Sequence, residues 1–322
     1  MAVAAYSFAH FAVDLGCAYA IFSIHRLSPT VFLLYNFFAF AMQMPLGLFA
    51  DRLQKNKLLA LLGIAVTLLC CCIPPSGAGM VCMLGLGNAL FHIGGGLDIM
   101  HHSGEKAAPL GIFVSPGAFG VFLGTMLGKG YTPFFPAAAA LVLAFAAVIF
   151  CTKQASPPVQ PALPQPSVIT PALLLFGVVI LRSFGGTAVQ LPWKAGIYTW
   201  IAVAMIVLGK ALGGMLADWL GAKSVSAFSL LIAALCFLLG RHAAAGLIGL
   251  LLFNMTMPIT LQVLSQKMPG AKGFSFGLLT FALFLGFLPF YLGAGGISTY
   301  AMAGIAAGSA ALLMLALRGG AP

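Results

Sequence analysis

Charged residues are too scarce in this sequence to cover the surface of a soluble protein. Only 6% of the 322 residues are Asp, Glu, Lys or Arg, whereas a soluble domain carries about 25%. Hydrophobic residues make up 61% of the chain, and they fall into runs close to the roughly 20 residues that a helix needs to cross a bilayer. The composition therefore predicts an integral membrane protein in a lipid bilayer and excludes soluble enzymes and nucleic-acid-binding proteins.

The apolar runs predict an all-α protein with twelve transmembrane helices. No basic segment or evident cleavage site accompanies the first run, so we expect a retained helix rather than a signal peptide. Segment 132–151 is weak enough to be re-entrant, which leaves ten or eleven complete spans as the alternative. The predicted spans are 2–23, 30–50, 57–74, 78–99, 108–128, 132–151, 170–189, 195–217, 223–240, 242–264, 272–293 and 297–317.

A proline-rich segment divides the chain at its midpoint. Residues 153–169 contain five prolines and no long apolar run, a composition typical of an extended, solvated linker. The predicted organisation is an N-terminal six-helix bundle over 1–152, this cytoplasmic linker, and a C-terminal six-helix bundle over 170–322.

The basic residues predict the orientation, because cytoplasmic loops are enriched in Lys and Arg. With a cytoplasmic N-terminus, the inner loops hold Arg52, Lys55, Lys57, Lys106, Lys153, Lys223, Lys267, Lys272 and Arg318. The outer loops hold Arg26, Lys129, Lys194 and Arg241. We therefore expect a multi-pass protein of the bacterial inner (cytoplasmic) membrane with both termini in the cytoplasm.

Two motifs recur at nearly the same offset. Gly47–Leu53 and Gly214–Leu220 share the pattern Gly-x-x-Ala-Asp-x-Leu, 167 residues apart. An offset of 166 pairs Asn88 with Asn254 and Gly111 with Gly277. The repeats predict a duplication whose halves are related by a pseudo-two-fold axis.

This combination resembles the major facilitator superfamily of transporters along the whole chain. The segments around His10–Asp14 and Asn88–His92 are also similar to its fosmidomycin-resistance branch of exporters. The resemblance implies that spans one, four, seven and ten line a central cavity. It also implies a cytoplasmic latch formed by Gly47, Asp51, Arg52, Gly214 and Asp218. Span four lacks the arginine of many proton-coupled exporters, and span five carries only part of their glycine-proline motif.

Polar residues recur at helical spacing on every third predicted span. Because such groups are costly in a bilayer, we expect them to face a substrate and proton cavity. The predicted cavity residues are His10, Asp14, Asn88, His92, Arg182, Gln190, Asn254, Gln262 and Lys210. The repeat offset places Arg182 opposite Asp14, which predicts a charge pair between the halves. The alternatives are a static packing pair, a packing histidine for His10 and, for Lys210 on the eighth predicted span, a side chain that extends toward the inner interface.

The predicted function is secondary active transport of a small organic solute, anionic or amphiphilic, by alternating access. Proton-coupled export is the expected mode. The alternatives are a proton-coupled nutrient symporter and a lipid or lysolipid flippase. An intramembrane enzyme based on His10, Asp14 and His92 is the candidate from another class.

No cofactor or metal site is predicted, and the chain is expected to be a monomer. Asp98, His101, His102 and Glu105 cluster at the end of span four, without the third imidazole or thiol that a zinc site would need. They are predicted to be a solvated cluster. A metal that persists in the purified protein would favour an enzyme or a metal exporter.

Overall fold

The computed structural model describes residues 1–24, 28–72, 77–153 and 160–318, and this part of the chain is helical. All twelve predicted segments contain helix, and an isolated bridge between Val189 and Ile297 is the one β-type pairing within these ranges. Arg26 and residues 154–159 of the predicted linker lie outside the described residues.

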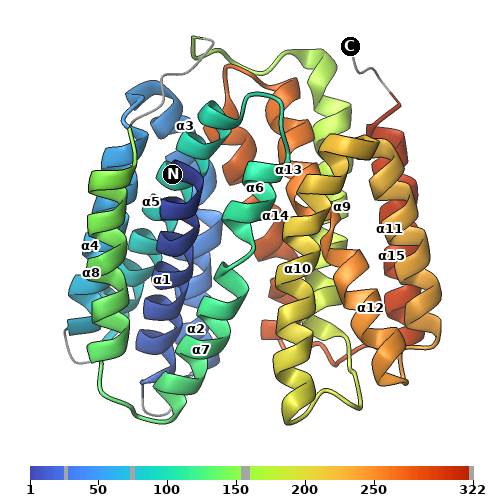
Figure 1. The fold of residues 1–322 in the computed structure, drawn as a ribbon, viewed down its shortest axis with the longest axis horizontal. Helices are drawn as coiled ribbons and strands as arrows, with labels where there is room; N and C mark the ends of the chain where they lie inside the picture. Colours follow the sequence, from blue (N-terminus) through green and yellow to red (C-terminus); the bar gives the residue numbers. More distant parts are fainter. Residues whose placement is uncertain (25–27, 73–76, 154–159, 319–322) are drawn as a thin grey trace. The chain divides into compact units, whose positions relative to one another are not determined.

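The helices are numbered along the chain in Figure 1. In the N-terminal part they are α1 Ala2–Phe22, α2 Pro29–Asn36, α3 Gln43–Leu53, α4 Asn56–Cys72, α5 Gly77–Ser103, α6 Ala108–Val114, α7 Gly117–Lys129 and α8 Phe135–Cys151. In the C-terminal part they are α9 Ile169–Ala188, α10 Ile197–Leu220, α11 Ala222–Leu238, α12 Ala243–Asn254, α13 Thr256–Lys267, α14 Lys272–Tyr291 and α15 Thr299–Ala316. A π-helix over Phe37–Ala41 joins α2 to α3, and a 3₁₀ turn over Pro166–Val168 precedes α9.

Nine helical stretches within the described ranges are long and apolar enough to cross a membrane. Three further apolar helices, α4, α8 and α11, have 17 residues each. Segment 132–151, which the sequence marked as weak, is one of these three. Twelve complete spans therefore stay a prediction.

Three of the long stretches are interrupted within their length. The fifth predicted span breaks between α6 and α7 at Ser115–Pro116, because proline supplies no backbone N–H and disfavours helix at the preceding residue. The tenth breaks after Asn254, and the second contains the π-helix. The fifth-span break lets the backbone of α7 approach the site described below.

The chain forms two compact units, each made of several separate stretches of the sequence. Unit 1 comprises residues 1–104, 112–162 and 269–281, and unit 2 comprises 105–111, 163–268 and 282–322. Residues 105–111 fall in unit 2 and residues 269–281 in unit 1, and the organisation as two six-helix bundles stays a prediction. α14 therefore belongs to unit 1 up to Phe281 and to unit 2 from Ala282.

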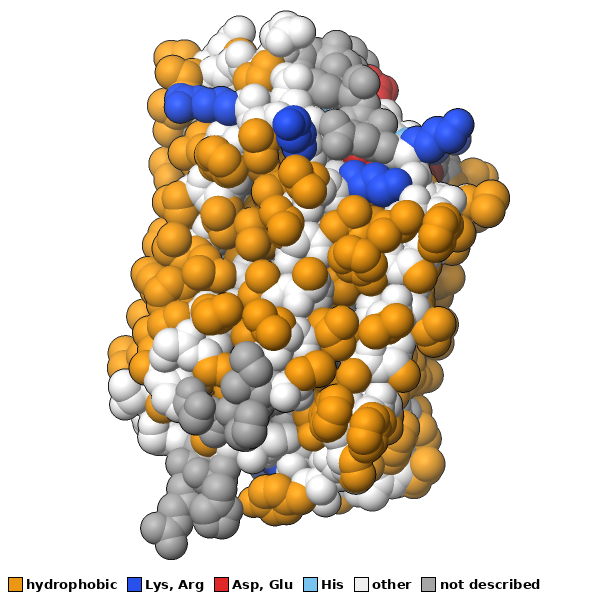
Figure 2. Space-filling model, turned by 90° about the vertical axis from the view of Figure 1, so that its left-hand side faces the viewer, with side chains coloured by type: hydrophobic (Ala, Val, Ile, Leu, Met, Phe, Trp, Pro, Cys, Tyr) orange, Lys and Arg blue, Asp and Glu red, His pale blue; other side chains and the backbone are white. Residues whose placement is uncertain are grey.

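Within unit 1, α1 and α5 are the interior helices. α1 packs against α4, α5, α7 and α8 (Figure 1). In the most apolar 18-residue segments of α1 and α5, about three quarters of the residues are buried. Figure 2 shows the outer face over this unit, where hydrophobic side chains form a tall band and most Lys and Arg gather near one end. Polar groups on α1 and α5 therefore lie inside the unit rather than on its apolar surface.

Candidate functional site

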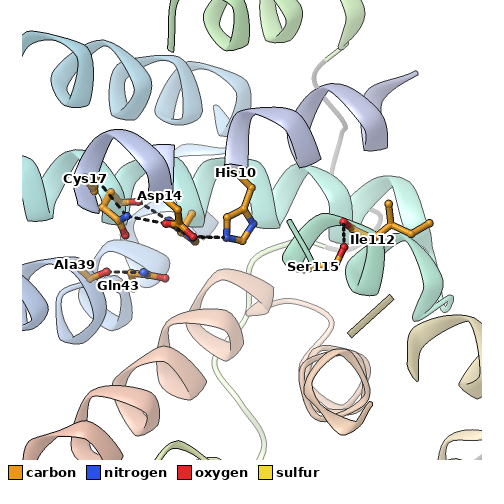
Figure 3. Close-up of polar contacts among 9 residues, drawn as sticks. His10, Asp14, Cys17, Ala39, Gln43, Ile112 and Ser115 are labelled. Carbon is orange, nitrogen blue, oxygen red and sulfur yellow. Dashed lines mark hydrogen bonds and ion pairs between the residues drawn. The ribbon is translucent and has the colours of Figure 1, made fainter. Parts of the chain in front are cut away.

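Unit 1 holds a buried polar cluster built from α1 and α5. α1 contributes His10 and Asp14, and α5 contributes Asn88 and His92, each pair one helical turn apart. The Nε2 atoms of His10 and His92 lie 3.0 Å apart, and His10 Nε2 lies 3.2 Å from Asp14 Oδ2. His92 Nε2 lies 3.7 Å from Asp14 Oδ1, which also accepts a 3.3 Å hydrogen bond from Asn88 Nδ2. Figure 3 shows His10 and Asp14 directed toward each other.

The backbone determines which nitrogen of His92 can accept a hydrogen bond. His92 Nδ1 lies 2.9 Å from the carbonyl oxygen of Asn88, so Nδ1 carries the proton and donates it. His92 Nε2 then faces His10 Nε2, 3.0 Å away. His10 Nδ1 has no hydrogen-bond partner among the described residues.

The wall of this cluster is made by glycine and aromatic rings. A Cβ atom on Gly117, the first residue of α7, would collide with Asp14 Oδ2 and His10 Nε2. The ring of Phe113 lies 4.8 Å from the His10 ring, and that of Phe91 lies 6.1 Å from it. Gly117 was not predicted as a site residue, because its role depends on the approach of a helix that is distant in sequence.

Asp98 corrects one expectation from the sequence. It was predicted to lie in a solvated cluster with His101, His102 and Glu105, but it is 0% exposed. Its carboxylate lies beside the Tyr6 hydroxyl of α1 and 3.8 Å from His102 Nδ1. The prediction is wrong for Asp98 because α5 continues past it and keeps it in contact with α1.

Unit 2 buries the arginine that the sequence singled out. Arg182 of α9 is 9% exposed, and its Nη2 donates a 3.1 Å hydrogen bond to the carbonyl oxygen of Phe253. Its guanidinium carbon lies 5.3 Å from the centre of the Phe253 ring. Arg182 Nε has no hydrogen-bond partner in the part of the chain that the structure describes. A pair between Asp14 and Arg182 would join the two units, and it stays a prediction.

Gln190 does not share a helix face with Arg182, so that expectation is wrong. α9 ends at Ala188, and Gln190 is exposed. The backbone there pairs with Ile297 instead, since Gln190 N donates to Ile297 O at 3.0 Å and Ile297 N donates to Ala188 O at 2.9 Å. This pairing replaces the next helical turn.

The remaining predicted cavity residues have different surroundings. Asn254 ends α12 and donates a 2.8 Å hydrogen bond to the carbonyl oxygen of Leu250. Gln262 lies on α13, beyond the helix break, and donates to the carbonyl oxygen of Glu105. Lys210 of α10 is half-buried and has an interaction partner. Asn254 and Gln262 therefore do not form one continuous helical stripe.

The two repeated Asp residues make equivalent contacts. Asp51 accepts backbone hydrogen bonds from Gly273 N at 2.7 Å and Phe274 N at 2.9 Å, at the start of α14. Asp218 accepts from Ala107 N and Ala108 N, also at 2.7 and 2.9 Å, at the start of α6. Carboxylates at helix N-termini satisfy unpaired N–H groups and interact favourably with the helix dipole. We call these two contacts the latch; Arg52 beside it is exposed.

Glycines let the backbones approach at both parts of the latch. In unit 1, a Cβ on Gly47 would collide with the carbonyl oxygen of Gly273, and one on Gly277 with that of Gln43. In unit 2 the corresponding collisions are Gly214 with the carbonyl oxygen of Ala107 and Gly111 with that of Lys210. Every one of these positions maps onto its counterpart at an offset of 166 or 167, so the repeat seen in the sequence is also a repeat of contacts.

No protein-family model matches the sequence, and no curated protein matches it. Solved structures match along nearly the whole chain. The major facilitator superfamily transporter FucP in its outward conformation has a TM-score of 0.65 and 12% identity, covering 97% of this chain and 99% of that chain. A variant of the E. coli fucose:proton symporter FucP has a TM-score of 0.62 and 13% identity, covering 98% and 97%.

The human organic anion transporter MFSD10 (TETRAN) has a TM-score of 0.66 and 14% identity, covering 97% of this chain and 99% of that chain. At these identities the likeness establishes the fold alone. The repeated contacts of Asp51 and Asp218 agree with a fold built from two similar halves.

Proposed function

We propose, on the premise that the chain has the fold of major facilitator superfamily transporters, that it is a secondary active transporter of a small organic solute. Such a protein works by alternating access, and it is not an enzyme. The observation that carries the proposal is the latch. Two short helix beginnings are each held by one carboxylate and by close backbone contact, an arrangement that can open without breaking a covalent bond or unfolding a helix.

The latch supports gating because its strength lies in a few local contacts. Asp51 holds the start of α14, and Asp218 holds the start of α6. The glycines at positions 47 and 214 allow these helices to meet backbone to backbone. In our proposal both contacts break when the cytoplasmic side opens.

The solute is proposed to be an organic anion. Unit 2 contains the buried guanidinium of Arg182, and its Nε–H has no hydrogen-bond partner among the described residues. Arg182 Nε is the group that would donate to a carboxylate or a phosphonate-like oxygen. Lys210 adds positive charge on α10, while His10, Asp14, Asn88 and His92 supply the polar side chains of unit 1. The description of MFSD10 as an organic anion transporter supports this choice by analogy.

We further propose that a proton gradient drives export across the bacterial inner membrane, with a monomer as the working unit and both termini in the cytoplasm. The sequence contains no phosphate-binding loop for ATP, and the excess of inner basic residues supports the orientation. Proton-coupled import is the second candidate, because FucP is described as a fucose:proton symporter.

The test is thermal stabilisation of the purified protein by a library of anions, cations, neutral metabolites and lipids. A ligand that binds only the folded state raises its stability with concentration. We expect anions to stabilise the wild type but not Arg182→Ala, while the matched variant Arg241→Ala, at an exposed position, keeps the response. Stabilisation by cations or lipids alone would contradict the anionic substrate.

Flux in proteoliposomes then decides direction and coupling. Anions that stabilise the protein are loaded inside or outside, with and without a pH gradient. We expect accumulation against the solute gradient when the pH gradient is imposed. Unchanged flux with and without the pH gradient would rule out proton coupling.

A further inference from the structure

We propose that His10, Asp14 and His92 form a binding site for a divalent first-row transition-metal cation of the Zn²⁺ type. The three side chains offer imidazole nitrogens and carboxylate oxygens as ligands. One such atom from each residue can be chosen so that all three atoms lie within 4.8 Å of one another. The Nε2 atoms of His10 and His92 lie 3.0 Å apart, and each approaches a different oxygen of Asp14: His10 Nε2 lies 3.2 Å from Oδ2, and His92 Nε2 lies 3.7 Å from Oδ1. Bonds of about 2.0–2.1 Å in a tetrahedron place neighbouring ligand atoms about 3.3 Å apart, so the separation of the two Nε2 atoms and that of His10 Nε2 from Asp14 Oδ2 fit two edges of a tetrahedral site.

A second observation points to a ligand at the same place. The Cβ that any other residue would carry at position 117 would strike both Asp14 Oδ2 and His10 Nε2. Two of the three donor atoms therefore lie where a side chain at position 117 would begin. A side chain at this position would compete directly with an ion bound between those donors.

Neighbouring groups orient the donors as they do in known metal sites. The Nδ1–H of His92 donates to the carbonyl oxygen of Asn88, which directs the Nε2 lone pair into the cluster. Asn88 Nδ2 donates to Asp14 Oδ1 and holds the carboxylate. Asn88 thus supports two of the three ligands, one through its backbone and one through its side chain.

The donor types select the class of cation. Two imidazoles with one carboxylate suit Zn²⁺, Co²⁺ or Ni²⁺, whereas Ca²⁺ and Mg²⁺ prefer sites built from oxygen atoms alone. Three protein ligands leave a fourth position for water or for an anionic group of a solute. The sequence predicted no metal site because the histidines are separated by 82 residues, far from any zinc-binding spacing.

The histidines are expected to contribute unequally. Ligation through His10 Nε2 requires its proton on Nδ1, which has no acceptor among the described residues. His92 already has its proton on the bonded Nδ1. Loss of His92 should therefore weaken binding more than loss of His10.

The experiment uses the full chain, purified in detergent after chelator treatment, and does not depend on transport. Zn²⁺ is added in calorimetry, and the zinc-loaded wild type is measured by X-ray absorption. We expect one ion per chain, with nitrogen and oxygen ligands at about 2.0–2.1 Å and imidazole scattering. Sulfur ligands at about 2.3 Å would place the ion on the cysteines and overturn the proposal, as would the absence of binding.

Variants test the individual residues. Asp14→Asn and His92→Gln should each lower the affinity by about 100-fold, and Asn88→Ala by about 10-fold or more. Gly117→Ala should abolish binding although it removes no ligand. His102→Gln, a matched change at an exposed position of α5, should bind like the wild type. Thermal unfolding without metal checks that each variant is folded, and wild-type affinity in Gly117→Ala or His92→Gln would refute the site.

Discussion

Replacing Asp51 with Asn should loosen the first turn of α14 without loosening the first turn of α6. Asp51 is half-buried and accepts two backbone hydrogen bonds, from Gly273 and Phe274. Asn keeps one acceptor oxygen, so it loses one of the two bonds and the negative charge at the helix terminus. A hydrogen bond to a charged group contributes about 1.5–3 kcal/mol, and we expect a loss of about 2 kcal/mol for this contact.

Asp218→Asn provides the reciprocal experiment. Asp218 is exposed, so solvent screens its charge and replaces part of the lost bonding. We therefore expect a smaller loss, about 1 kcal/mol. The two values correspond to roughly 30-fold and 5-fold changes in the local opening equilibrium.

Hydrogen–deuterium exchange with mass spectrometry measures both effects in one data set. Peptides that cover residues 271–276 and 106–110 report the two helix starts. Asp51→Asn should speed exchange in the first peptide by about 30-fold, and Asp218→Asn in the second by about 5-fold. Equal changes in both peptides for each variant, or no change in either, would refute the account of the latch as two separate carboxylate contacts.

Three further predictions test packing and charge. Gly63→Ala should destabilise unit 1 by about 2 kcal/mol in thermal unfolding, because the added Cβ would collide with the backbone of Phe91 and Gly87. Gly304→Ala is the control and should show little change, because no atom lies within 4 Å of the added Cβ. Lys57→Ala should lower the free energy of unfolding by about 1 kcal/mol, because Lys57 Nζ donates to the carbonyl oxygens of Ile149 and Thr152 at the end of α8. Lys55→Ala, at an exposed position, is the control, and equal effects of the two substitutions would argue against this helix cap. Asp98→Ala should lower the unfolding temperature more than Glu105→Ala, because Asp98 is buried beside Tyr6 whereas Glu105 is exposed. A larger decrease for Glu105→Ala in thermal unfolding would contradict a stabilising role of the Asp98 carboxylate.

Apolar length and repeated motifs predicted much of the fold. The bilayer allows long apolar runs to be recognised without tertiary information, and all twelve predicted segments contain helix. The duplicated Asp51 and Asp218 also pointed to equivalent positions. Their partners were not predicted, because a capping contact depends on which helix start lies nearby rather than on local spacing.

The site was predictable only where helical spacing sufficed. His10 with Asp14, and Asn88 with His92, share helix faces as expected and meet in one cluster. The prediction for Gln190 failed because α9 ends at Ala188, where the backbone pairs with Ile297 instead. The prediction for Asp98 failed because its burial depends on the packing of α5 against α1, which the sequence of α5 alone does not reveal.

Alternating access is the central claim, and electron–electron distance measurements between spin labels test it most directly. One label pair is at Lys55 and Lys223, close in sequence to Asp51 and Asp218, and another is at Tyr131 and Arg241, in loops predicted to lie on the opposite face; all four positions are exposed. Labels on unnatural amino acids leave the seven cysteines intact. We predict two distance populations for each pair, shifting in opposite directions when a stabilising anion is added or the latch is weakened by Asp51→Asn. A single distance for both pairs under every condition would contradict the account.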